Sequence, residues 1–428
     1  MEYNALIELL NADTADKRLS ALSDIKKKID SGEIASPQKT DNVNNHIHTT
    51  YSFSPYSPTK AVYMAYMNGL VTAGIMDHDS IGGAKEFIEA GKIFDIATTV
   101  GIEARVDISK TKIYQKGRKV NNPDMDSVIY VALHGVPHQN IDMVNGYFAP
   151  FRKHRNIRNM KMCENITNLI KHLGISLDFE RDVLPLSQYH DTGSVTERHV
   201  LFALAKILCE KYQAPKDILE FFKTEMKLNI SEKIEKLVLD CDPRYYLYDI
   251  LGILKSDFVE KFYIAPYDEC PNIEDYIKLA KATGSIAAYP YLGDVGESVT
   301  GDKRPEKFED DYLDLLFDEL KFLGFNAVTY MPTRNTKAQL ERLIGLCEKN
   351  NLFQVSGEDI NSPRQSFICK ALEDPMFKHL IKSTWALIGH ETAATEDESN
   401  SMFSEKTIKR YPDIKDRVEY YYKLGAPK

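Results

Sequence analysis

The stretch of sequence that decides the predicted fold is Asn44-Asn45-His46-Ile47-His48-Thr49-Thr50-Tyr51-Ser52, and Asp77-His78-Asp79-Ser80 follows it. An apolar run over 70–76 precedes the second motif and predicts a short strand. In an extended segment, residues two apart point the same way, so the rings of His46 and His48 can reach one ion. A His-x-His pair alone is a weak signal, and the second motif could also be turn chemistry with an aspartate capping the next helix.

Short apolar strands alternate with helices on both sides of these motifs. Ser57-Pro58 is a good helix start, with serine as the N-cap and proline in the first turn, and Gly69 is a good stop. An alternation of strands and helices predicts a parallel sheet with crossover connections. Further strands are expected at 97–102, 128–133, 285–291, 327–330 and 353–357, with helices at 83–93, 310–323 and 337–350.

The residues that suit metal binding all follow predicted strands. In a parallel barrel the carboxyl ends of the strands open onto one face, so residues far apart in the sequence meet there. Imidazoles and carboxylates suit Zn²⁺, Mn²⁺ or Fe²⁺, and a carboxylate such as Glu103 can bridge two ions. A lone histidine after a strand is more often structural, but the joint placement predicts a shared cup formed by His46, His48, His78, Glu103, His134 and Asp359.

The pattern of apolar residues along the sequence divides the chain into five parts. Apolar residues recur at helical spacing near the start, strands alternate with helices in two separate regions, and long amphipathic stretches lie between those regions. We expect a helical leader at 1–40, the two parts of a barrel at 41–150 and 258–364, a mainly helical insertion at 151–257 and a helical extension at 365–428.

The composition is that of an ordinary soluble globular protein. The 428 residues include 54 basic and 63 acidic side chains, and the net charge of −9 argues against extended nucleic acid as a partner. A small anionic substrate held by a local basic patch remains compatible with this charge. Six single cysteines and the lack of any run of about 20 apolar residues favour a cytoplasmic protein without a membrane partner. The absence of P-loop, Gly-x-Gly-x-x-Gly and Gly-x-Ser-x-Gly motifs counts against nucleotide-driven motors, Rossmann dehydrogenases and α/β-hydrolases.

The ordered motifs resemble those of the PHP (polymerase and histidinol phosphatase) domain. The resemblance rests on 46–52, 77–80 and Gly101-Ile102-Glu103, covers about 46–134 and resumes weakly at 285–361. It implies a distorted seven-stranded (β/α)7 barrel that carries up to three divalent metals at its carboxyl-end face and hydrolyses phosphate esters. By this resemblance the first metal would take His46, His48, Glu103 and Asp359, the second would take Glu103, His134 and a histidine before a late proline, and the third would take His78 and two further ligands.

Three positions depart from the family pattern. Phe53 stands where an aspartate or histidine should follow the Tyr-Ser pair, Tyr289 where a histidine should precede the proline, and Asn361 where the last motif should end in histidine. Phe53 cannot ligate a metal and Asn361 is at best a weak carbonyl donor, so we expect the third site to be lost or weak. Tyr289 could coordinate only as a phenolate. We therefore expect two divalent ions, Mn, Zn or Fe.

Basic side chains in the predicted insertion are candidates for holding a substrate phosphate. Arg155 and Arg158 lie at helical i, i+3 spacing, and similar arginines approach phosphate in the family; the alternative is a basic, solvated helix face. Arg334-Asn335 is a second candidate. The segment Glu197-Arg198-His199 resembles an Arg-Pro-His element near the family's active site, and His199 could instead be a surface or capping residue.

The sequence favours a metal-dependent phosphoesterase. Metal-activated water would hydrolyse a phosphate ester on a small metabolite or nucleotide, with Glu103, His78 and Asp359 as catalytic residues. Two alternatives stay open. One is a degenerate PHP barrel that binds metal or a ligand without turnover, and the other is a metal-dependent hydrolase of non-phosphate bonds.

Overall fold

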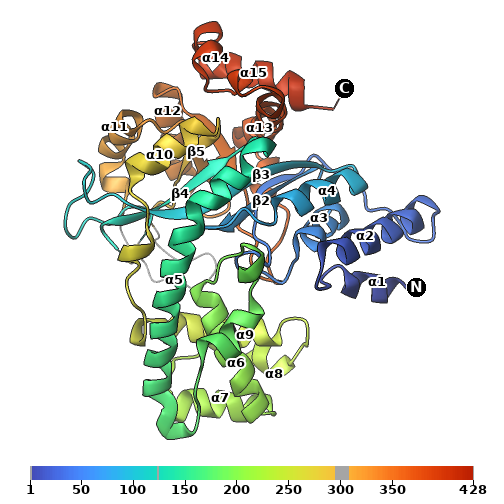
Figure 1. Cartoon of the computed structure of the whole chain (residues 1–428), viewed down its shortest axis with the longest axis vertical. Helices are drawn as coiled ribbons and strands as arrows, with labels where there is room; N and C mark the ends of the chain where they lie inside the picture. Colours follow the sequence, from blue (N-terminus) through green and yellow to red (C-terminus); the bar gives the residue numbers. More distant parts are fainter. Residues whose placement is uncertain (1, 123–124, 295–307, 428) are drawn as a thin grey trace.

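A mixed sheet of seven strands lies at the centre of the chain's computed structural model, which describes residues 2–122, 125–294 and 308–427 (Figure 1). The strands lie in the sheet in chain order. The expected strands are all present, and β6 has the predicted bounds. The strands are β1 (Val43–Ile47), β2 (Thr72–His78), β3 (Ala97–Asp107), β4 (Val128–His134), β5 (Ile286–Pro290), β6 (Ala327–Tyr330) and β7 (Phe353–Ser356).

The expectation that all strands run parallel is wrong for β4. This strand pairs antiparallel with both β3 and β5, whereas all other neighbouring strands are parallel. Parallel neighbours need a crossover, usually a helix, but the segment between β3 and β4 forms no helix in its described residues, so the chain simply turns back. The carboxyl end of β4, where His134 lies, therefore faces the opposite edge of the sheet from the carboxyl end of β3.

The sheet nearly closes into a barrel between its first and last strands. Ile47 forms a parallel bridge with Ile360, just beyond β7. The backbone N–H of His48 donates to the carbonyl of Ile360 at 2.9 Å, and the N–H of Ile360 donates to the carbonyl of His46 at 3.1 Å. This closure places the turn after β7 directly beside the first histidine motif.

The amino-terminal helices pack beside β1, β2 and β3. They are α1 (Tyr3–Leu9), α2 (Ala15–Asp30), α3 (Pro58–Met67) and α4 (Ala84–Phe94). Two of them lie within 1–40, and the division of the chain there stays a prediction. Ser57 caps α3 as predicted, accepting a hydrogen bond from the N–H of Lys60 at 3.0 Å. A buried pair of Arg18 in α2 with Glu86 in α4, 2.5 Å apart, attaches the leader to the barrel helices.

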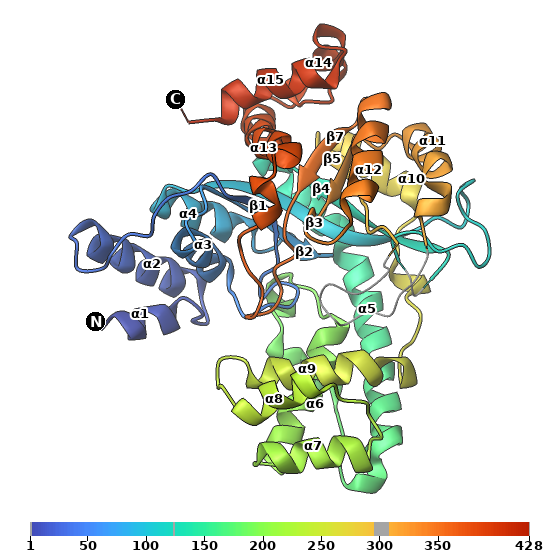
Figure 2. The ribbon, with the colours of Figure 1, turned by 180° about the vertical axis from the view of Figure 1, so that it is seen from behind.

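The central helical region projects from the sheet along the long helix α5 (Figure 2). It contains a hydrophobic cluster of its own, with Leu204, Phe222 and Ile250 fully buried in it. Helix α5 begins ten residues before the predicted start of the insertion and spans both regions, so that boundary stays a prediction. The helices are α5 (Ile141–Ile170), α6 (Glu197–Lys211), α7 (Pro215–Thr224), α8 (Glu232–Asp240) and α9 (Tyr246–Asp257).

The remaining helices cover the second half of the sheet. Helices α10 (Ile273–Ala282), α11 (Leu313–Leu323) and α12 (Lys337–Lys349) alternate with β5, β6 and β7. Helix α13 (Lys378–Glu396) buries Ala386 and Leu387 against Ala132 and Phe353 of the sheet, together with α14 (Glu405–Arg410) and α15 (Ile414–Gly425). In the described part of the chain, no helix is both long enough and apolar enough to cross a bilayer. All six cysteines are free thiols.

Candidate metal centre

Five of the predicted metal ligands converge where β1, β2 and β7 end. His48 lies at the centre, with its Nε2 atom 3.2 Å from Nε2 of His46 and 3.0 Å from Oδ1 of Asp359. Oε2 of Glu103 is 3.1 Å from Nδ1 of His78, and it lies 3.7 Å and 3.9 Å from Nε2 of His46 and of His48. Residues from four separate segments thus surround one small volume.

The second motif holds the first motif in place. The buried carboxylate of Asp77 accepts hydrogen bonds from the backbone N–H of Thr49 at 2.7 Å and from the hydroxyl of Ser52 at 2.6 Å. The same Ser52 hydroxyl lies 3.4 Å from Nδ1 of His48. The turn after β1 is therefore fixed from β2, and the orientation of the His48 ring is fixed with it.

The separations between donor atoms fit a cation. His46, His48 and Asp359 form one group whose ligand atoms lie within 4.8 Å of one another, and His48, His78 and Glu103 form a second group. Metal–ligand bonds of about 2.0–2.2 Å put neighbouring ligand atoms roughly 3 Å apart. The His46–His48, His48–Asp359 and His78–Glu103 pairs have separations of 3.2, 3.0 and 3.1 Å. The two Nε2 atoms of His46 and His48 face each other, and a shared cation would satisfy both. The residues present therefore fit one or two divalent ions.

The protonation states of the cluster also suit a cation. Burial would raise the pKa of Glu103, but the three neighbouring histidines outweigh it and lower that pKa to about 2. Burial would also raise the pKa of Asp359, but the neighbouring His48 outweighs burial and lowers that pKa well below its usual value. Burial lowers the pKa of His78 to about 3, whereas the carboxylate of Glu103 raises that of His46 against the effect of burial. Ionised carboxylates and a neutral imidazole are the forms that bind divalent metals. The shifts at Glu103, Asp359 and His78 therefore suit a cation, whereas His46 would have to lose a proton to bind one.

His134 lies on an antiparallel strand, and not at the carboxyl end of a parallel strand as the sequence suggested. It lies on the antiparallel strand β4, two residues from Ala132, which pairs directly with Glu103, so His134 and Glu103 share a face of the sheet. Burial, and then the neighbouring His46, lower the pKa of His134 to about 3. Its Nε2 atom is buried and has no hydrogen-bond partner among the described residues. An unpaired buried nitrogen on this face suits a ligand role, although His134 belongs to neither of the two close groups.

The three positions that depart from the family pattern have other partners. Phe53 is buried and packs edge-on against His199, with ring centroids 5.0 Å apart. Asn361 donates a hydrogen bond to Oδ1 of Asp359 at 2.6 Å. Tyr289 is fully buried and donates to the carboxylate of Glu309, whose pKa burial raises to about 7. Burial and the Glu309 charge raise the pKa of Tyr289 well above its usual value, which disfavours a phenolate ligand.

Arg155 and Arg158 lie in a buried ion-pair network next to the centre. Arg155 pairs with Asp79 at 2.5 Å and donates to Glu269 at 3.0 Å, and Arg158 donates to Glu269 at 2.6 Å. The solvated basic face proposed as the alternative is therefore wrong, since both side chains are buried. Aspartate capping of the next helix is also wrong, because α4 starts after Gly83 without a side-chain cap. The network joins Arg105, Arg155 and Arg158 to Asp79, Glu197 and Glu269.

His199 and Arg334-Asn335 have structural partners in the described chain. His199 takes part in a capping box at the start of α6, where its Nδ1 accepts the backbone N–H of Thr196 at 3.0 Å. The capping alternative is thus confirmed for this residue. Arg334 and Asn335 both donate to the carbonyl of Leu292, at 3.2 Å and 2.8 Å. Their role toward a substrate stays a prediction.

Two residues near the centre were not singled out from the sequence. Arg198, next to His199, lowers the pKa of Asp359 through its charge, and it forms no hydrogen bond or close ion pair with the described residues. Tyr130 on β4 lies opposite Arg105 in the sheet, with its ring centroid 6.4 Å from that of His78. Arg198 belongs to the segment that resembles the Arg-Pro-His element, where only His199 was considered as a site residue. Tyr130 belongs to no recognisable motif, so only the fold brings it to the site.

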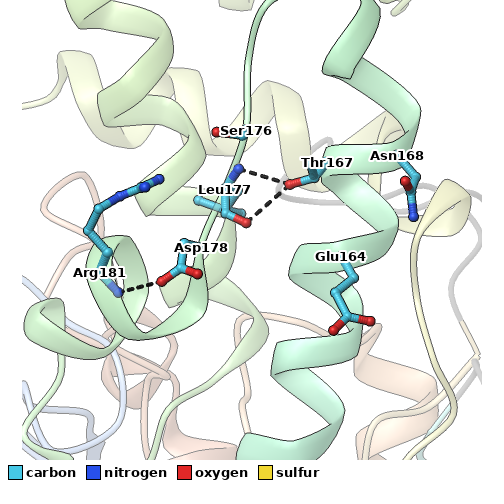
Figure 3. A pocket seen from close by; sticks show the side chains of 7 residues that line it. All are labelled: Glu164, Thr167, Asn168, Ser176, Leu177, Asp178 and Arg181. Atoms are coloured by element: carbon cyan, nitrogen blue, oxygen red, sulfur yellow. Dashed lines mark hydrogen bonds between the residues drawn. The ribbon is translucent and has the colours of Figure 1, made fainter.

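Two open pockets elsewhere lack the histidines of the centre. One has a volume of about 400 Å³ and lies in the helical region between α5 and the segment that follows it (Figure 3). Its polar groups are largely bonded to one another, since Thr167 bonds both backbone groups of Leu177, and Asp178 accepts the N–H of Arg181. The other, of about 500 Å³, lies at the end of β3 and includes Tyr267. Neither competes with the metal centre as the site of chemistry.

Comparison with known proteins supports the fold. No protein-family model and no curated protein matches the sequence. The chain is similar to the crystal structure of a proposed metal-dependent phosphoesterase from Bifidobacterium adolescentis, at 17% sequence identity and a TM-score of 0.51, covering 81% of this chain and 97% of that one. It also matches an amidohydrolase from Chromobacterium violaceum with bound sulfate and no metal, at 14% identity and a TM-score of 0.47, covering 77% and 90%. The first likeness shows a shared fold.

Proposed function

We propose that the protein is a metal-dependent hydrolase that cleaves phosphate esters of a small metabolite or nucleotide. The observation that carries the proposal is the convergence of His46, His48, His78, Glu103 and Asp359 on one volume. The similar fold of a proposed metal-dependent phosphoesterase and the PHP-like motifs both point to phosphate as the group attacked.

The candidate ligands form two groups, each of which would hold one ion. His46, His48 and Asp359 would hold one ion, and His48, His78 and Glu103 form the group that would hold the other. Glu103 would be shared between the two because it lies 3.7 Å from His46 and 3.1 Å from His78, and His134 is a further candidate ligand. When bound, divalent cations such as Mn, Zn or Fe supply Lewis acidity and a water nucleophile at neutral pH. The low pKa of Glu103 keeps its carboxylate charged, and the Asp77 contacts keep the His48 ring from turning.

The exposure of the ligands shows where a substrate would enter. The His48 side chain is 1% exposed, whereas those of His78 and Asp359 are 31% and 37% exposed. The cluster is thus closed at the bottom and open at the side of His78 and Asp359. The charge of Arg198 lowers the pKa of Asp359 on this side, and a positive charge suits an anionic phosphoryl group. Arg155 and Arg158 are already neutralised by carboxylates, so Arg198 is the better candidate for this contact.

A second candidate function is metal or ligand binding without turnover. The contacts of Phe53, Tyr289 and Asn361 favour it, because each of these residues packs or bonds where a ligand would be expected from the family pattern. These losses concern mainly the third metal, however, and leave the two close groups intact.

A substrate screen separates these functions. Purified protein is loaded with Mn²⁺ and assayed on phosphomonoesters, cyclic and bisphosphate nucleotides, and on amide substrates for the non-phosphate alternative. We expect phosphate release by the wild type that Glu103→Ala abolishes, and a metal content near two ions per chain by elemental analysis. Equal inactivity of both proteins on every phosphate ester would refute the phosphoesterase proposal, and turnover of amides alone would favour the other hydrolase class.

A further inference from the structure

A tyrosine whose hydroxyl no described residue binds, Tyr130, has its ring next to that of His78 at the metal centre. Tyr130 occupies β4 directly opposite Arg105 of β3, and Ala132 with Glu103 is the pair two residues along the strands. Directly opposite residues share a face of the sheet, as do residues two apart. Tyr130 therefore lies on the same face as Glu103, two pairs farther toward the carboxyl end of β3.

The neighbours of Tyr130 fix its ring but leave its hydroxyl unused. The ring centroid is 6.4 Å from that of His78. On the other side, Arg105 is held by Glu269 and by the hydroxyl of Tyr263 at 3.4 Å. The Tyr130 side chain is half-buried, and among the described residues Tyr130 forms hydrogen bonds only through its backbone, with Asn121 at 2.8 Å and 2.9 Å. A phenylalanine would fill the same space, so packing alone does not account for the phenol.

We propose that the Tyr130 hydroxyl donates a hydrogen bond to an anionic oxygen of the substrate's phosphoryl group. The group would sit over the His78–Glu103 side of the centre, while Arg198 faces the Asp359 side. The proposal rests on the proposed function, since it assumes a phosphorylated substrate at this centre. A rigidly held neutral donor binds an oxyanion without the cost of ordering a flexible side chain.

Tyr130→Phe tests the proposal, with Tyr263→Phe as the matched control. The control removes a nearby phenol that accepts a hydrogen bond from Arg105, and no ring contact with His78 is seen for it among the described residues. Both variants are compared with wild type for kcat/KM on the best phosphate ester and for inorganic phosphate binding to the Mn²⁺-loaded protein by calorimetry. A hydrogen bond to a charged oxygen predicts an approximately 10- to 100-fold loss in Tyr130→Phe. We expect unchanged metal content and melting temperature in that variant, and near-wild-type values in the control.

Each outcome decides the proposal. Wild-type kinetics and phosphate affinity in Tyr130→Phe would overturn it, as would an equal loss in Tyr263→Phe, which would mean that both phenols act through Arg105. A loss of bound metal in Tyr130→Phe would also overturn it, because the residue would then support the centre rather than contact the substrate. If Tyr130→Phe does not fold, Tyr130→His supplies a ring N–H donor and should retain measurable phosphate binding. An inactive wild type would refute the proposed function, and phosphate binding would still decide the role of Tyr130.

Discussion

Replacing Glu269 with glutamine is expected to destabilise the protein by about 3–5 kcal/mol, the usual cost of removing one partner from a buried ion pair. The Glu269 side chain is 2% exposed and accepts hydrogen bonds from three arginines. Glutamine keeps its shape but removes the charge and presents N–H donors to guanidinium donors. Three buried guanidinium groups would then share the two remaining carboxylates, Asp79 and Glu197.

Urea unfolding followed by circular dichroism measures this loss at pH 7. Glu89→Gln serves as the control, because it removes an exposed partner of Lys92 and should leave the unfolding midpoint unchanged. Burial would raise the pKa of Glu269, but Arg155, Arg105 and Arg158 outweigh it and lower that pKa. The stabilisation is therefore present above the unfolded-state pKa, near 4.5, and is lost as the pH falls through the lower folded-state pKa. A loss below about 1 kcal/mol at pH 7 would refute the idea that Glu269 neutralises these arginines, given the cost of an uncompensated buried charge.

Three further predictions follow from individual contacts. His134→Ala should lower the metal content measured by elemental analysis. The substitution breaks no hydrogen bond at Nε2, because that atom has no partner among the described residues. An unchanged metal content would exclude His134 as a ligand. Burial raises the pKa of Glu309 to about 7, so the stability it contributes is full below about pH 4.5 and lost as the pH rises through 7. Melting temperatures between pH 5 and pH 8 should therefore fall relative to those of Glu309→Gln, and parallel curves would contradict this. Phe53→Asp should cost at least the roughly 3–5 kcal/mol of a buried phenylalanine truncation without adding a metal, as checked by urea unfolding and elemental analysis.

The strands and helices of this chain could be predicted largely from periodicity and end signals. The strand β6 and the helix α12 lie within one residue of their predicted bounds, because apolar runs there are short and clearly delimited. The direction of β4 could not be predicted in this way, since the apolar pattern of a strand is the same in either direction. A usable signal was the polar, lysine-rich connection before β4, which lacks helical periodicity and so offers no crossover helix.

The convergence of the candidate ligands could be predicted, but the partners of the arginines could not. His46, His78 and Glu103 are placed by strands that the sequence shows clearly, so their meeting follows from the sheet. Arg155 shows a helical spacing in the sequence, but the sequence does not show that Glu269, more than a hundred residues later, lies against it. Charge pairing over such distances depends on the fold, so a basic helix face can become a neutral buried network.

The exposure of the candidate ligands bears on what the centre does. Structural metal sites are closed by protein ligands, whereas catalytic sites keep a position open. Here His48 is buried at the base, Asp77 fixes its surroundings, and His78 and Asp359 border the solvent. A cluster that served only to stabilise the fold would gain nothing from exposing its charged carboxylate, because exposure weakens every electrostatic contact that it makes. The rigid base and open rim therefore favour a centre that exchanges a ligand with solvent over one that only ties the strands together.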